Sequence, residues 1–202
     1  MIELIKMNMD NSSINDVIRE RRSLYPAQYS NETIDDSIIE ELLENANWAP
    51  SHKRTYPWRF TVFTGKGLEK LAEFQSNLYK KVSQKESSFD ENKFQKLSQK
   101  PLMASHVIAI GMKRDPKKSV PEEEEIASVA CAVQNMHLTA SSKGLGAYWG
   151  TGGITYFEEA KEFFGLGEDD KLMGFFFLGT LKIDKWPKGI RKPYEDFVNW
   201  VR

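Results

Sequence analysis

Basic side chains occur in short clusters at the ends of expected structural elements. The clusters are Arg21-Arg22-Ser23, Lys53-Arg54 and Lys188-Gly189-Ile190-Arg191-Lys192. Arginine presents a planar fork of N–H donors that matches a phosphate group, and a neighbouring serine hydroxyl adds another donor. Loops rich in aromatic residues lie around Trp58 and around Tyr148-Trp149. Each cluster alone is most simply a solvated surface, but the set together suggests a ligand with an aromatic ring and a phosphate.

Three histidines and one cysteine are the other candidates for chemistry. His52, His106 and His137 show no ligand spacing, so no metal site is expected. His106 begins an expected buried strand and His137 lies on an expected core helix, so both should be packed and hydrogen-bonded, whereas His52 falls in a loop. Cys131 has no cationic neighbour in sequence to favour a thiolate. We therefore expect Cys131 to be a buried structural residue.

Composition excludes several classes of protein. The chain has 202 residues, of which 40% are hydrophobic, and its formal net charge is −1, so it can bury a core and is not a generally basic nucleic-acid binder. A single cysteine cannot form an intramolecular disulfide, which favours a reducing compartment. Charge interrupts the first ten residues too early for a signal peptide, and the longest apolar runs, 107–112 and 173–178, are too short to span a membrane. We expect a soluble, cytoplasmic protein with neither a membrane nor a nucleic-acid partner.

Helix and strand signals alternate along the whole chain. Capping signals at Ser13 and Thr155 and stop signals such as Ala49-Pro50 mark helix ends. The patterns predict helices over 13–22, 33–49, 122–143 and 155–165, and strands over 57–64, 103–112, 145–149 and 171–180. The charged segment 68–100 reads as one or two exposed helices, which could form a lid or insert. No repeat or low-complexity linker divides the chain, so we expect one domain over 1–202 that mixes helices and strands.

Glycine clusters do not form a nucleotide-binding loop. After Gly144 and Gly146 the third glycine of a dinucleotide fingerprint is replaced by Trp149, and the preceding element is a helix rather than a strand. Gly144 is therefore expected to be a helix C-cap.

Taken in order, the motifs resemble the flavin-dependent nitroreductase family. Arg21-Arg22-Ser23 is similar to the Arg-Arg-Ser after the family's first helix, and residues 49–60 are similar to its Ala-Pro-Ser…Gln-Pro-Trp-x-Phe segment. Further similar segments are 132–138, the Gly-Leu-Gly-x-x-Trp turn over 144–149, Phe177-Leu178-Gly179-Thr180 and Arg191-Lys192-Pro193. The likeness covers about the whole chain.

The resemblance implies an α+β fold with helices around a central, mainly antiparallel mixed sheet. It implies an intertwined homodimer with one FMN at each of two sites across the interface. Arg21, Ser23 and Arg191 would engage the phosphate and ribityl chain, with Arg22 alongside. Pro50, Ser51, His52 and Arg54 would approach from the partner subunit, and Trp149, Gly150, Thr151 and Gly152 would lie by the isoalloxazine.

The implied activity is a ping-pong reaction in which NADH or NADPH delivers hydride to the flavin and a nitroaromatic, quinone or similar acceptor then takes it. The cofactor supplies this chemistry, so no obligatory acid or base is named, and His52 is a candidate donor only. Two alternatives stay open. One is an FMN enzyme of different chemistry, such as a dehalogenase or dehydrogenase. The other is a flavin- or small-molecule-binding protein without turnover, since Tyr25 stands where many relatives have a second basic residue.

Overall fold

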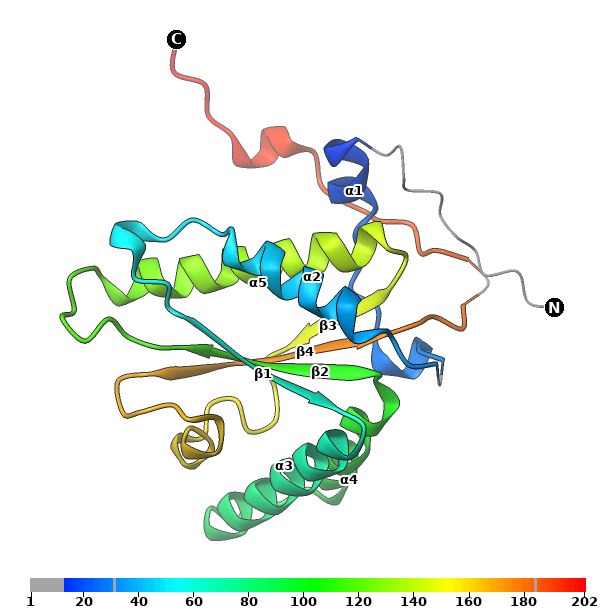
Figure 1. The fold of residues 1–202 in the computed structure, drawn as a ribbon, viewed down its shortest axis with the longest axis vertical. Coiled ribbons are helices and arrows are strands. Elements are labelled where there is room, and N and C mark those ends of the chain that lie inside the picture. The colour runs from blue at the N-terminus through cyan, green and yellow to red at the C-terminus, as the bar shows by residue number, and fades with distance from the viewer. Residues whose placement is uncertain (1–12, 31, 184) are drawn as a thin grey trace.

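Four antiparallel strands form the centre of the molecule (Figure 1). The computed structural model describes residues 13–30, 32–183 and 185–202. The strands are β1 (Trp58–Thr64), β2 (His106–Met112), β3 (Gly146–Gly150) and β4 (Lys171–Gly179), and their spatial order is β1-β2-β4-β3. Each neighbouring pair is antiparallel. The predicted combination of helices with a mainly antiparallel sheet is confirmed.

Helices cover both faces of this sheet (Figure 1). One face carries α2 (Asp36–Asn47) and α5 (Glu122–Ser142), and the other carries α3 (Lys66–Lys85) and α4 (Glu91–Gln99). Alternate side chains of β2 point to opposite faces, so Ile108 and Ile110 join the core under α5 while Val107 and Ala109 join the core under α3. The prediction of a strand buried on both faces is confirmed for β2, although it starts later than expected because Lys100–Met103 forms a 3₁₀ turn.

Capping residues set where the helices begin. The short helix α1 (Ile14–Glu20) starts with the predicted capping box between Ser13 and Asp16. Helix α2 starts a turn later than predicted, because the Asp35 carboxylate accepts the Ser37 N–H at 2.9 Å and so makes Asp35 the N-cap. Gly144 follows α5 with φ +67°, which confirms its role in ending the helix.

Residues 155–165 do not form the predicted helix. They form two separate 3₁₀ turns, Glu158–Ala160 and Glu162–Phe164. The Thr155 hydroxyl donates to the carbonyl of Gly152 at 2.9 Å instead of accepting a backbone N–H, so the expected capping box is not made. The following backbone bonds span three residues, which builds 3₁₀ turns.

Cys131 is exposed, so the prediction of a buried cysteine is wrong for the single chain. Helix α5 turns Val129, Val133 and Met136 toward the sheet, and Cys131 lies on the opposite side of the helix. His106 and His137 are buried as expected. The imidazole of His106 lies between Ser105 and Asp36, at 2.9 and 3.0 Å.

Tyr29 fixes the segment after α1 to the sheet. Its hydroxyl donates to the carbonyls of Leu24 and Phe177, at 2.7 and 3.2 Å. Its ring occupies the space that a Cβ would need at Gly146 and Gly179, where the contacts would be 2.5 and 2.4 Å. Glycine at these two positions therefore lets the ring lie flat against β3 and β4.

The C-terminal tail runs over the side of the molecule that carries α1 (Figure 1). It contains a 3₁₀ turn over Tyr194–Phe197 and is otherwise without regular structure. No helix in the described ranges has the length and apolar character needed to cross a membrane.

Candidate functional site

An arginine cluster lies beside the C-terminal half of α5. The guanidinium of Arg21 contacts the His137 ring, with 3.3 Å between Nη1 and Nε2. Arg22 donates from Nε to the carbonyl of Pro187 at 2.9 Å, and a Cβ on Gly189 would come within 2.5 Å of its guanidinium carbon. The tail therefore passes directly over Arg22. This path brings Arg191, two residues further on, near Arg21.

The charges in this cluster are poorly compensated. Burial lowers the pKa of Arg21, and the nearby charges of Arg191 and Arg22 lower it further. Arg22 has a distant carboxylate, Glu20, at 3.8 Å, but Arg21 has no carboxylate partner in the part of the chain that the structure describes. A bound anion would relieve this repulsion, and arginine forks suit a phosphate. Ser23 is exposed beside the cluster.

His137 holds the cluster without adding charge to it. Burial lowers the pKa of His137 to about 4, and the charge of Arg21 contributes in the same direction. The ring is therefore neutral at pH 7, and its Nε2 lies 3.0 Å from the carbonyl of Arg22, so Nε2–H donates to that oxygen. His137 thus fixes the backbone of Arg22 and lies against the guanidinium of Arg21.

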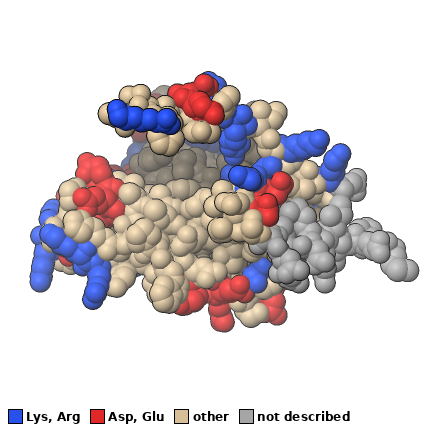
Figure 2. Space-filling view, turned by 90° about the horizontal axis from the view of Figure 1, so that it is seen from above, with Lys and Arg blue, Asp and Glu red and all other residues tan. Residues whose placement is uncertain are grey.

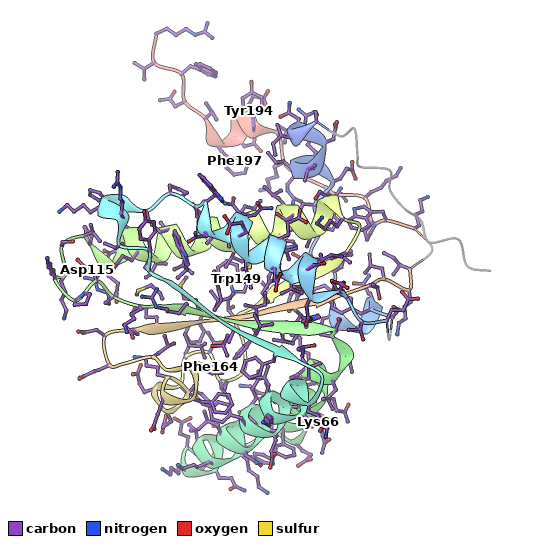
Figure 3. All side chains as sticks on the ribbon, in the orientation of Figure 1. Lys66, Asp115, Trp149, Phe164, Tyr194 and Phe197 are labelled. Carbon is purple, nitrogen blue, oxygen red and sulfur yellow. The ribbon has the colours of Figure 1, made fainter. Side chains whose placement is uncertain are left out.

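Two aromatic side chains of β3 lie on opposite faces of the sheet, Tyr148 against the core on the α3 side and Trp149 against the core under α5. Tyr25 packs on Tyr148, with 4.6 Å between ring centroids. The indole N–H of Trp149 donates to the carbonyl of Met173 at 2.9 Å. Met173 is the extra residue where the β2–β4 register shifts, and such a bulge frees a carbonyl from the ladder. Trp149 lies between the sheet and the helices above it (Figure 3).

Lys100 is a site residue that the sequence did not reveal. Its Nζ lies 4.4 Å from the ring centroid of Tyr148 and 3.4 Å from the position of a Cβ on Gly150. Burial lowers its pKa, and it makes no ion pair with any described residue. The segment around it has several lysines, so spacing does not single it out. Lys100 comes to lie beside Gly150 only in the folded sheet.

The loop after β3 is open to a ligand. Thr151 and Gly152 are exposed, and a Cβ on Gly152 would meet no atom within 4 Å. Gly153, with φ +72°, lies against Leu97 of α4. The predicted residues of this end of the molecule thus form two groups, the arginine cluster of Arg21, Arg22, Ser23 and Arg191, and the end of β3 with Trp149, Gly150, Thr151 and Gly152. Thr151 and Gly152 are exposed there, whereas Gly150 is buried.

The other predicted residues, Pro50, Ser51, His52 and Arg54, lie at the opposite end of α5. The His52 Nδ1 pairs with a carboxylate oxygen of Glu124 in the first turn of α5. Lys53 donates from Nζ to the carbonyl of Ser119 at 2.7 Å. Lys53, Arg54 and Tyr56 have φ values of 52, 56 and 45°, a left-handed conformation that strains non-glycine residues.

These two groups of residues do not meet within one chain. Glu124 and His137 mark them on α5, and at 1.5 Å per residue they lie roughly 20 Å apart along the helix axis. In Figure 1 the loop after α2 and the helix α1 lie at opposite ends of α5. The structure therefore places the predicted residues in two separate groups, one at each end of α5.

Comparisons with known proteins show which family the chain is similar to. The family model described as "Nitroreductase family" matches residues 18–180. The chain belongs to the nitroreductase family. A protein of Escherichia coli strain K12 assigned as an NAD(P)H nitroreductase, YdjA, is 32% identical over 142 residues, which is 70% of this chain and 75% of that protein. A Bacillus subtilis protein assigned in the same way, YfhC, is 27% identical over 79% of this chain and 80% of its own length.

Solved structures of nitroreductases have the same fold. A nitroreductase-like family protein from Bacillus cereus superposes with a TM-score of 0.78 at 29% identity, over 94% of this chain and 96% of that chain. A nitroreductase with bound FMN from Bacteroides fragilis gives a TM-score of 0.69 at 21% identity, over 95% and 100%. The sequence-based recognition of the nitroreductase family is thereby confirmed.

Proposed function

We propose that this nitroreductase is an FMN-dependent NAD(P)H oxidoreductase that reduces nitroaromatics, quinones or similar acceptors by ping-pong hydride transfer. Bound FMN would accept hydride from NADH or NADPH and pass it to the second substrate. The observation that carries the proposal is the arginine cluster without a carboxylate on Arg21, which opens onto the β3 surface. Relatives assigned as NAD(P)H nitroreductases and similar folds with bound FMN support it.

The residues of this surface fit the parts of FMN. The phosphate fits Arg21, Arg22 and Arg191, with the Ser23 hydroxyl as a further donor. The flat ring system fits the exposed residues Thr151 and Gly152 that follow β3.

Lys100 adds a cation on the Tyr148 face of β3. It has no carboxylate partner among the described residues, and its Nζ lies 3.4 Å from the position of a Cβ on Gly150, next to the exposed residues after β3. A cation placed there would stabilise negative charge on a reduced ring, which is the electrostatic contribution that proteins make in such sites.

We further propose that the functional unit is a homodimer in which Pro50, Ser51, His52 and Arg54 of one chain complete the site of the other. The tail supports this, because Phe197, Trp200 and Val201 are 74, 67 and 91% exposed. Figure 3 shows Phe197 on the tail, outside the helical layer above the sheet. The outer edge of β1 is also unpaired in the sheet order, so a second chain could add to it. With a single cysteine, the protein suits the reducing cytoplasm.

The visible absorption spectrum of the purified protein tests the proposed function. We expect flavin bands, FMN released on heating, and bleaching when NADH or NADPH is added without oxygen. A colourless protein that also fails to bind added FMN would overturn the proposal. A flavin that is bound but is not bleached by either nicotinamide would overturn the oxidoreductase part alone.

A further inference from the structure

Two side-chain contacts tie the loop of His52 to the segment between β2 and α5. His52 pairs with the carboxylate of Glu124, and the Nζ of Lys53 donates to the carbonyl of Ser119 at 2.7 Å. Lys53 and Arg54 have positive φ values, a conformation that non-glycine residues do not favour by themselves. The place of this loop therefore depends on how firmly Ser119 and Glu124 are held.

A buried ion pair fixes the segment that contains these two groups. The side chain of Glu125 is 1% exposed, and one of its carboxylate oxygens pairs with the guanidinium of Arg114. The other oxygen accepts the backbone N–H of Asp115 at 2.9 Å. The same guanidinium donates to the carbonyl of Val120 at 3.3 Å. Glu125 and Arg114 thus tie both ends of the loop 113–121 to the first turn of α5.

Further hydrogen bonds extend this order to Ser119. The carboxylate of Asp115 accepts the backbone N–H of Ser119 at 3.0 Å and its hydroxyl at 2.5 Å. Asp115 is itself held by Glu125 through its N–H, and Glu124 directly precedes Glu125 in the helix. Both groups that contact the loop of His52 are therefore connected to one buried carboxylate.

The figures show these elements at one end of the molecule. In Figure 1 the loop before α5 and the loop after α2 lie at the same end of α5, and Figure 3 shows Asp115 at that end. Figure 2 shows Lys and Arg beside Asp and Glu at the left edge, which is this end seen from above. A buried pair returns little net stability, because removing two charges from water offsets their attraction. Stability alone therefore does not account for the Arg114–Glu125 pair.

We propose that Glu125, through its pair with Arg114, is a positioning residue for the loop of His52. This inference rests on the proposed function, in which the loop completes a flavin site, and it adds the buried group that sets the place of the loop. Glu125 acts through Glu124 and Ser119 rather than by contact with a ligand. Loss of the pair should loosen the loop and weaken flavin binding, even where the fold is as stable as before.

Hydrogen–deuterium exchange over residues 51–57, measured without added FMN, reports the order of the loop directly. The amides of Arg54, Thr55 and Tyr56 donate to groups of the loop itself, at 3.0, 3.3 and 2.9 Å. They exchange faster when the loop opens more often.

The main variant combines Arg114→Met with Glu125→Leu. Apolar residues of similar volume replace both charges, a change that commonly leaves the free energy of unfolding unchanged or raises it. We expect exchange over 51–57 to become about tenfold faster and FMN affinity to fall about tenfold. A second variant, Asp115→Ala, removes the acceptor of Ser119 without touching the buried pair, and it should change both quantities in the same direction by a smaller factor.

Two control variants separate positioning from other effects. Asp169→Asn breaks the surface pair of Lys118 with Asp169 on the same segment and leaves the contacts of Glu125 in place. Leu71→Ala removes a fully buried side chain of α3 on the other face of the sheet, so it lowers the free energy of unfolding without a change near the loop. Neither control should speed exchange over 51–57.

Fluorescence titration of FMN on the same proteins completes the test. Faster exchange together with weaker FMN binding would support both the inference and the role of the loop in the flavin site. Faster exchange with unchanged FMN binding would support positioning by Glu125 and would contradict the proposed role of the loop. Unchanged exchange in the double variant and in Asp115→Ala, or an equal acceleration in Leu71→Ala, would overturn the inference.

Discussion

The two ends of α5 are held in different ways. At the His137 end, Arg21 and Arg22 are fixed by a buried imidazole, by the tail and by the Tyr29 anchor. At the Glu124 end, the loop of His52 is held by two side-chain contacts at the surface and carries three residues with positive φ. The difference is that buried contacts within the chain hold the arginine cluster, whereas surface contacts alone hold the loop of His52 in a strained conformation.

Replacing His137, at the arginine-cluster end of α5, should remove a large pH dependence of the free energy of unfolding. The pKa of His137 is about 4 in the folded chain and about 6.5 when unfolded. The unfolded chain therefore binds the proton first, and stability falls as the pH drops from 6.5 to 4. The expected loss is about 3 kcal/mol.

Denaturant unfolding of the wild type and of His137→Gln at several pH values measures this contribution. Other groups titrate alike in both proteins, so the difference between the two curves isolates His137. Parallel curves between pH 7 and 4 would show that the imidazole is not held neutral in the fold.

Arg21→Met should lower the affinity for FMN by about 100-fold, because a charge-assisted contact to phosphate from a partly buried guanidinium is lost. Arg19→Met is the matched control, since Arg19 is exposed on α1 two residues earlier. Titration of FMN fluorescence measures both affinities. Equal affinities for the two variants would remove the arginine cluster from the phosphate site.

Lys100→Met should slow flavin reduction by NADH or NADPH about tenfold, because a cation beside the ring is lost. The stability should change by less than about 1 kcal/mol, since the variant also removes the cost of burying a charge without a carboxylate. Stopped-flow bleaching and denaturant unfolding give the two numbers. A large loss of stability with normal flavin reduction would make Lys100 a packing residue only.

The smallest effect is expected at the Glu124 end of α5. Glu124→Gln should weaken the contact to His52 and lower turnover about threefold, which corresponds to less than about 1 kcal/mol. Glu123→Gln is the control, because Glu123 is exposed in the same helical turn and makes no side-chain hydrogen bond or ion pair with a described residue. A turnover equal to that of the control would show that Glu124 does not position the loop.

Local patterns predicted most of the elements. The helically spaced apolar residues from Ile126 to Ala140 predicted α5, and the capping box at Ser13 predicted α1, because both signals act within a few residues. Thr155 gave the same local signal, but its hydroxyl donates to the carbonyl of Gly152, and this competing local hydrogen bond replaces the helix cap.

Residues that act through tertiary structure could not be predicted in this way. Lys100 contacts Tyr148 of β3 only because the 3₁₀ turn before β2 brings it there. Cys131 was predicted to be buried because α5 is apolar. It is exposed because it lies on the side of α5 that faces away from the sheet. A single chain does not contain the surface that such a face requires.

Complementation between two defective chains tests most directly the claim that each site combines the two ends of α5 from different chains. One chain carries Arg21→Met, and the other carries Ser51→Ala, His52→Ala and Arg54→Ala. After unfolding and refolding together, random pairing makes about half of the dimers mixed, and each mixed dimer has one intact site. The account predicts that the mixture recovers about a quarter of the wild-type turnover and bound FMN. Activity equal to the mean of the two variants measured separately would contradict it.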